Sequence, residues 1–248
     1  EIYNKILEID NKEAGAYYAI AMILERKNKL SESIKYYELA IRYDKMYFDA
    51  YLYLADVYEK LNEFEKAEKN YKLAIEVNKE NFWAYNNYGS FLEEHNKNEL
   101  ALENFKIALD NEPNHYLAFF NIAVVYKKMK KFGLAIENYR YSIEDNEYYP
   151  YSFLNLSIIY KELSQYNLAV QVISEGIVYN PDISVLYYNR AIFLVKEKEN
   201  TKAIEDLQKV TKLSPSLIKY IKEDEDFSVL REYKKFNELF IKKDEIKN

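Results

Sequence analysis

The amino-acid sequence predicts an all-α solenoid of six stacked helical hairpins, on the basis of a repeat, a periodicity and a composition. The repeat is 34 residues long, and six units follow one another without insertion over residues 14–217. In each unit, positions 4, 7, 8 and 11 have the spacing of one helix face, and positions 20, 24, 27 and 28 have that of a second. Of the 248 residues, 49% are hydrophobic and 31% charged, as in folded globular chains.

Residue types at fixed positions justify each pair of helices. Small residues at positions 8 and 20 allow two helix backbones to approach closely, and aromatic side chains at position 4 fill the space beside them. Position 4 holds Tyr17, Tyr51, Tyr85, Phe119, Phe153 and Tyr187. Position 8 holds Ala21, Ala55, Gly89, Ala123, Ser157 and Ala191. Each unit is therefore expected to form two packed helices.

The turns between the helices have their own signals. Position 15 holds Asn28, Asn62 and Asn96 in three units, and asparagine suits the left-handed backbone that ends a helix. Position 32 holds a proline in three units, where it stops the second helix or starts the next. These prolines are Pro113, Pro181 and Pro215. Helix breaks are therefore predicted near positions 15 and 32 of every unit.

The two ends of the chain differ from the repeats. Residues 1–13 continue the repeat pattern backward and predict the second helix of a truncated preceding unit, so we expect a fragment of a longer array. Residues 218–248 break the pattern but keep spaced apolar residues among charges. Because the last hairpin of a stacked array exposes an apolar face, this segment is predicted to form C-terminal capping helices.

Composition excludes most chemistry that can be recognised from sequence. There is no cysteine, the two histidines are twenty residues apart, and the four glycines are too scattered for a phosphate-binding loop. We therefore predict no enzyme activity, no catalytic residue, no cofactor and no metal. The net charge of −6 argues against nucleic acid, and no apolar run is long enough to span a membrane. The expected location is the cytoplasm.

This arrangement of small, aromatic and proline positions resembles the tetratricopeptide repeat family, over all six units. The resemblance implies a right-handed superhelix whose first helices line a concave groove, with positions 2, 5, 6, 9, 12 and 13 facing it. It also implies a protein-interaction scaffold that binds a peptide or helical segment of a partner protein. Arg190 departs from the pattern at position 7 of the sixth unit, where packing and a salt bridge are expected of it.

Asparagine recurs at position 6 of four successive units, as Asn87, Asn121, Asn155 and Asn189. An asparagine amide has one acceptor and two donors, so it is able to pair with both the N–H and the C=O of an extended backbone. A row of such amides predicts contact with a bound peptide, while the alternative is that each amide bonds to the backbone of an adjacent unit.

Apolar residues recur at positions 5 and 9 of the last three units, beyond what hairpin packing requires. They are Phe120, Val124, Leu154, Ile158, Tyr188 and Ile192. Exposed apolar surface marks interaction sites, so these residues are predicted to accept apolar side chains of the partner. Alternatively, they pack on one another or on the C-terminal segment. Trp83 at position 2 is either an anchor for the partner or a packing residue.

Other functions use different residues. Some members of the resembled family bind acidic chaperone tails through Lys and Asn at positions 5 and 9, but Tyr18 and Met22 stand there in the first unit, so this clamp is absent. Two alternatives remain open. The chain is a regulatory or substrate-recruiting region of a larger enzyme, such as a glycosyltransferase, or it is a scaffold that self-associates into a homo-oligomer.

Overall fold

The structure is a computed structural model that describes residues 2–241, and every regular element in this range is a helix. The predicted all-α solenoid of helical hairpins is therefore confirmed. Backbone contacts divide the chain into two compact units, Glu1–Pro113 and Asn114–Asn248. They are called here the N-terminal unit and the C-terminal unit. Residues 242–248 of the predicted cap lie outside the described residues.

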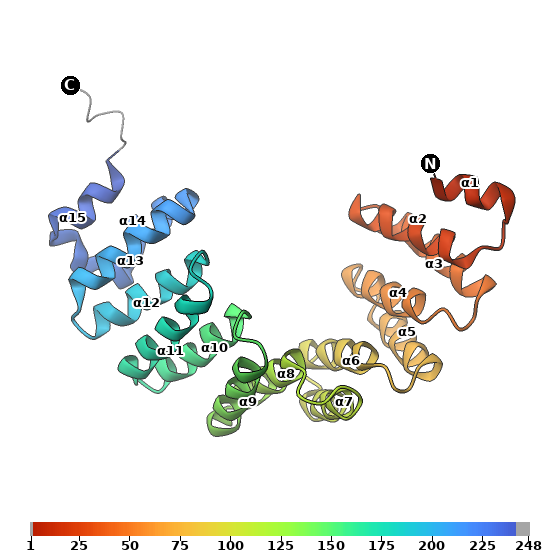
Figure 1. Ribbon diagram of the computed structural model, residues 1–248, viewed down its shortest axis with the longest axis horizontal. Helices are drawn as coiled ribbons and strands as arrows, with labels where there is room; N and C mark the ends of the chain where they lie inside the picture. The colour runs from red at the N-terminus through yellow and green to blue at the C-terminus, as the bar shows by residue number, and fades with distance from the viewer. Residues whose placement is uncertain (1, 242–248) are drawn as a thin grey trace. The chain divides into compact units, whose positions relative to one another are not determined.

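The described part of the N-terminal unit consists of a lone helix followed by three hairpins (Figure 1). The helices are α1 (Ile2–Ile9), α2 (Ala14–Arg26), α3 (Leu30–Tyr43), α4 (Phe48–Lys60), α5 (Phe64–Val77), α6 (Phe82–Glu94) and α7 (Asn98–Asn111). Helices α2 and α3, α4 and α5, and α6 and α7 pair within hairpins, while α3 packs on α4 and α5 on α6. The helix α1 packs against α2 and leaves Ile2 and Ile9 exposed.

The described part of the C-terminal unit consists of three hairpins and a closing series of short helices (Figure 1). The hairpin helices are α8 (Tyr116–Lys128), α9 (Phe132–Asp145), α10 (Pro150–Glu162), α11 (Tyr166–Tyr179), α12 (Ser184–Lys196) and α13 (Asn200–Leu213). The closing elements are η1 (Pro215–Leu217), α14 (Ile218–Glu223), η2 (Glu225–Glu232), α15 (Lys234–Asn237) and η3 (Glu238–Phe240).

All six turns within the hairpins have the same backbone geometry. Position 15 is left-handed in every unit, with φ between 57° and 63°. The residues are Asn28, Asn62, Asn96, Lys130, Ser164 and Lys198. The following N–H bonds back to the helix, for example Lys29 N to Leu24 O at 2.9 Å, which closes a Schellman motif. The predicted breaks are confirmed, and the fixed turn imposes the left-handed conformation even on lysine and serine.

Close helix crossings explain the small residues of the repeat. Ala21, Ala55, Ala123 and Ala191 at position 8 are fully buried. A Cβ atom built on Gly89, which holds this position in the third unit, would lie 2.7 Å from the ring of Phe105. The aromatic ring at position 24 thus occupies the space that a larger residue at position 8 would need.

Arg190 forms the ion pair that was predicted for it. Its Nε and Nη2 atoms donate to the two carboxylate oxygens of Asp206 at 2.7 Å and 2.6 Å, and Nη1 donates to Ser174 Oγ at 3.0 Å. Asp206 is buried on α13 and Ser174 lies on α11. The guanidinium group therefore joins the last two hairpins through three hydrogen bonds, two of them to one carboxylate.

The closing elements cover the last hairpin. Ile221, Phe227, Leu230 and Phe236 are buried in one cluster with residues of α12 and α13, including Ile192. The closing elements are short helical pieces of 3 to 8 residues. The Asp224 side chain accepts a hydrogen bond from Asp226 N at 2.9 Å and starts η2.

Gly89→Ala is expected to destabilise the protein by about 1–3 kcal/mol, because the new methyl group overlaps the buried Phe105 ring. Gly133→Ala is the matched control, since a Cβ atom there meets nothing within 4 Å. The control is expected to gain about 0.4–1 kcal/mol through reduced chain entropy in the unfolded state. Denaturant midpoints followed by circular dichroism measure both, and equal shifts for the two variants would contradict this packing.

The contacts of Glu68 on α5 are expected to make the stability of the fold depend on pH. Glu68 accepts hydrogen bonds from Lys72 at 2.8 Å, Lys97 at 2.9 Å and the Tyr88 hydroxyl at 3.1 Å. The two lysines outweigh burial and lower the pKa of Glu68 from 4.5 to about 2. A depressed carboxyl pKa stabilises the folded state above the unfolded pKa, and this stabilisation is lost as the pH falls from 4.5 towards 2.

Glu68→Gln is therefore expected to lower the free energy of unfolding by about 1 kcal/mol at neutral pH. The difference in unfolding free energy between the variant and wild type should shrink as the pH falls from 4.5 towards 2. Urea titrations at a series of pH values measure it. Glu76→Gln, an exposed position on the same helix, is the control and should show no such trend. A pH-independent difference for Glu68→Gln would show that its lysine contacts do not stabilise the fold.

Candidate partner-binding surface

Two adjoining cavities lie along the first helices of the N-terminal unit. The α2–α4 cavity, of about 560 Å³, is lined by Met22, Glu25, Arg26, Asn28, Leu30, Tyr53 and Lys60. The α4–α6 cavity, of about 490 Å³, is lined by Phe48, Asp49, Leu52, Tyr53, Asp56, Asn81, Trp83 and Asn87. Tyr53 lines both cavities, so together they form a continuous surface of three successive hairpins.

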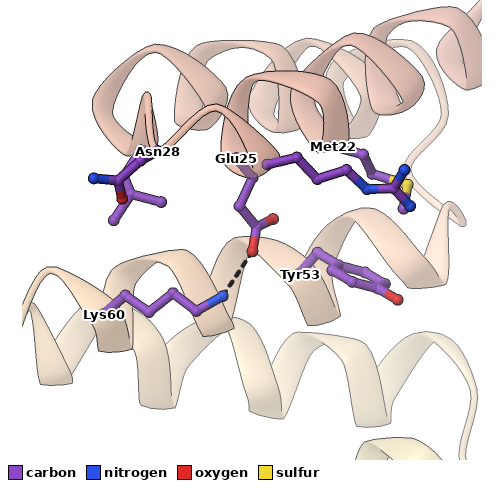
Figure 2. A pocket seen from close by; sticks show the side chains of 7 residues that line it. Met22, Glu25, Asn28, Tyr53 and Lys60 are labelled. Atoms are coloured by element: carbon purple, nitrogen blue, oxygen red, sulfur yellow. Dashed lines mark hydrogen bonds and ion pairs between the residues drawn. The ribbon is translucent and has the colours of Figure 1, made fainter. Parts of the chain in front are cut away.

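Charges in the α2–α4 cavity are paired. Figure 2 shows Glu25 on α2 reaching Lys60 on α4, with an Nζ to carboxylate distance of 2.7 Å. Glu25 also accepts a hydrogen bond from the Tyr37 hydroxyl at 2.8 Å, and Lys60 binds Asp56 at 2.5 Å. Burial acts to lower the pKa of Lys60, but the carboxylates of Asp56 and Glu25 outweigh it and raise this pKa. Lys60 thus holds two carboxylates and links two hairpins.

The α4–α6 cavity contains two of the predicted residues, Trp83 and Asn87. The Trp83 side chain is 44% exposed, and Tyr53 across the cavity is 36% exposed. Asn87 Oδ1 accepts a hydrogen bond from Asn86 Nδ2 at 3.4 Å. Partial burial raises the pKa of Asp49, which lines the same cavity. Aromatic, amide and carboxylate groups therefore meet at one place.

In the C-terminal unit, the predicted apolar residues lie on the first helices α8, α10 and α12. Phe120, Val124, Leu154 and Ile158 are half-buried. The Phe120 ring packs edge-on against Tyr139 and Tyr149, with centroid distances of 5.6 Å and 5.2 Å. Phe120 therefore packs within its own repeat unit, and all four side chains keep part of their surface in solvent.

Two of the asparagine amides at position 6, those of Asn155 and Asn189, bond within their own helices. Asn155 Nδ2 donates to Tyr151 O at 3.0 Å, and Asn189 Nδ2 donates to Val185 O at 2.9 Å. Each bond reaches one turn back within the same helix, so the adjacent unit is not the acceptor. Because an amide has two donors and one acceptor, this bond orients the group and leaves further capacity for hydrogen bonding. Asn87 and Asn121 are half-buried at the equivalent positions.

The closing elements, rather than a partner, cover the end of the predicted apolar row. Ile192 is only 6% exposed and lies in one cluster with Phe227 and Leu230. The Tyr188 ring packs edge-on against Phe227 at 5.5 Å, and its hydroxyl donates to Asp224. Ile192 is therefore a core residue with no surface for a bound side chain, and Tyr188 is an attachment point for the cap.

Several residues at these surfaces are absent from the predicted set. In the C-terminal unit, Tyr149 contacts Tyr116, Phe120 and Tyr151 at centroid distances of 5.0 Å, 5.2 Å and 5.4 Å. Tyr151 is 51% exposed. Tyr151 stands at position 2 of its unit, as Trp83 does, so the recurrence of an aromatic residue at position 2 was visible in the sequence. The N-terminal carboxylates Asp49 and Asp56 had no such signal, because neither belongs to a repeated position of one residue type.

The described range 2–241 holds no group of histidine and acidic side chains arranged to bind a metal ion. Nor does any helix in that range have the length and apolar character required to cross a bilayer.

Stacked α-hairpins with cavities along their first helices define a helical-repeat protein of the scaffold class. Family models of the tetratricopeptide repeat match residues 16–83 and 185–217, the first spanning α2 to α5 and the second α12 and α13. These matches show that the chain contains tetratricopeptide repeats. No significant match was found among curated protein sequences.

Solved structures of this fold are similar to the chain. PilF from Pseudomonas aeruginosa has 20% identity and a TM-score of 0.68, with 88% of this chain and 96% of PilF covered. YrrB, a tetratricopeptide repeat protein with an unusual peptide-binding site, has 20% identity and a TM-score of 0.56, covering 75% and 96%. A chain of the APC/C hetero-tetramer Cut9–Hcn1 has 16% identity and a TM-score of 0.67. The alignment covers 97% of this chain but 45% of that one. These likenesses establish the fold.

Phe227→Ala tests the role of the cap over Tyr188 and Ile192. Removing this fully buried ring is expected to cost about 3–5 kcal/mol and to expose apolar surface of α12. Val229→Ala in the same helix is the control, because Val229 is exposed and its truncation should stay within about 0.5 kcal/mol. Denaturant midpoints and binding of an apolar dye measure the two variants. If Phe227→Ala leaves both readouts unchanged, the closing elements do not cover this face.

Proposed function

We propose that this chain is a scaffold that binds an extended or helical segment of a partner protein along the first helices of its hairpins. The observation that carries the proposal is the placement of Asn155 beside Tyr151 and Leu154 on α10. The asparagine amide is held by its own helix, while the Tyr151 ring is 51% exposed and contacts the Tyr149 ring on one side.

This arrangement supplies both parts of peptide recognition. The oriented amides of Asn155 and Asn189, and the amide of Asn121 at the equivalent position, offer hydrogen-bonding groups to a partner backbone, with little dependence on its sequence. The half-buried apolar side chains Phe120, Val124, Leu154 and Ile158 offer contact area beside them. In the N-terminal unit, Asn87 provides the amide group and Trp83 provides the apolar contact area. Tyr188 has a reduced role and Ile192 has none, because the cap covers them.

A peptide-binding role is described for YrrB, which shares this fold. That likeness supports the class of function and says nothing of the partner. No observed feature of the chain favours recruitment to an enzyme over a scaffold role. Self-association is separated from partner binding by measuring sedimentation of the chain alone across a concentration series.

The test is selection of binders from a random-peptide display library against the whole chain. We expect selected peptides to bind with about micromolar affinity, near 8 kcal/mol, and with weak dependence on salt. The double variant Asn121→Ala, Asn155→Ala should weaken binding about tenfold, since backbone hydrogen bonds are lost.

A matched control is available on the second helices. Asn104 and Asn138 make the same bond to the carbonyl one turn back, at 2.8 Å and 2.9 Å. The double variant Asn104→Ala, Asn138→Ala should therefore retain the affinity of wild type. If the library produces no binder, or if both double variants bind equally well, the proposed function is wrong.

A further inference from the structure

We propose that the α4–α6 cavity is a specificity pocket for a basic side chain, lysine or arginine, of the partner segment. This inference rests on the proposed function and adds the chemistry of the partner. It is carried by the juxtaposition of aromatic walls with an uncompensated carboxylate in one cavity of about 490 Å³.

Aromatic side chains form the walls. Phe48 and Tyr53 come from α4 and Trp83 from α6, and Trp83 and Tyr53 keep large parts of their surface in solvent. An aromatic face attracts a cation that lies within about 6 Å of the ring centroid, and tryptophan is the strongest of the aromatic residues in this interaction. A long side chain with an apolar stem and a cationic end fits such walls over its whole length.

The charge of the cavity is negative. Its lining includes the carboxylates of Asp49 and Asp56 and no lysine or arginine. Asp56 is compensated by Lys60, at 2.5 Å. Asp49 makes no hydrogen bond or ion pair with any residue in the described range 2–241, and it is exposed to solvent where it lines the cavity. An entering ammonium or guanidinium group would supply the missing counter-charge.

A structural role explains only part of the placement of Asp49. An acidic residue in the first turn of a helix is favoured by the helix dipole, and Asp49 lies in the first turn of α4. Glu99 lies in the first turn of α7 in the same way, but it does not line either cavity. The dipole accounts for a negative charge at this point of the helix and not for the three aromatic side chains around it.

The neighbouring α2–α4 cavity differs from the α4–α6 cavity in the charge of its lining. There Lys60 already neutralises Glu25, and Arg26 adds a further positive charge to the lining. A basic side chain should therefore prefer the α4–α6 cavity, beyond Tyr53. The net charge of −6 on the whole chain also favours approach of a basic partner.

The experiment uses the single tryptophan of the chain, Trp83, as a reporter in the pocket. Acetylated and amidated alanine pentapeptides with a central Lys, Arg, Gln or Glu are titrated into the whole chain at low salt. We expect saturable changes of tryptophan emission with Lys and Arg, at about millimolar dissociation constants. Gln and Glu peptides should bind at least about tenfold more weakly, since the cation–π and ionic contacts are absent.

Variants identify the group responsible. Asp49→Asn should weaken binding of the Lys peptide about fivefold to tenfold, while Asp49→Glu should retain most of the affinity. Glu99→Gln is the control for loss of a first-turn charge and should bind as wild type does. Thermal melts of each variant establish that the fold is retained, so that a loss of binding is assigned to the pocket.

Three results would overturn the inference: equal binding of the Lys and Gln peptides, unchanged binding by Asp49→Asn, or equal loss in the Glu99→Gln control. The display selection above is a separate readout. If the selected peptides require Asn121 and Asn155 for binding but contain no basic residue, this inference is wrong and the proposed function is supported.

Discussion

The structure depends on close approach of helix backbones at small residues, with large aromatic rings filling the space that these residues leave. Ala21, Ala55, Ala123 and Ala191 are fully buried at one repeat position, and the Phe105 ring leaves no room for a Cβ atom on Gly89. Because protein interiors are close-packed, each crossing fixes the distance and direction of the next helix. The identical left-handed turn in every hairpin then repeats this geometry along each compact unit.

The packing within a hairpin involves only some positions of the first helix, and the side chains at other positions are free to differ. Positions 2, 5, 6 and 9 carry side chains such as Trp83, Asn155 and Tyr151 that are not required for the hairpin itself. The exposed ones among them are available for binding. Their residue types differ between units at positions 2, 5 and 9, whereas asparagine recurs at position 6. In the N-terminal unit these positions bring two aromatic rings and an unpaired carboxylate to one cavity. In the C-terminal unit they present asparagine amides beside apolar side chains.

The closing elements show that the same repeat position serves different purposes. Ile192 and Ile158 both stand at position 9, but Ile192 is buried under Phe227 and Leu230, while Ile158 is half-buried. Position in the repeat therefore does not decide exposure at the end of the array, because a segment distant in sequence folds over it. Arg190 illustrates the same point, since a charged residue at an apolar position is satisfied by Asp206 on the next helix.

The sequence by itself determined the helices, their breaks and the pairing of helices into hairpins, because these follow from local periodicity and from contacts inside one 34-residue unit. It also identified Trp83, Asn87 and Asn155 as candidates, since repeated positions are visible without a structure. Only the tertiary structure decided that Asp49 and Tyr53 share a cavity with Trp83, and that Asn155 bonds to its own helix. It also decided that the cap covers Ile192. The reason is physical: side-chain exposure and ion pairing depend on which residues from other hairpins lie alongside, and the repeat pattern carries no information on those contacts.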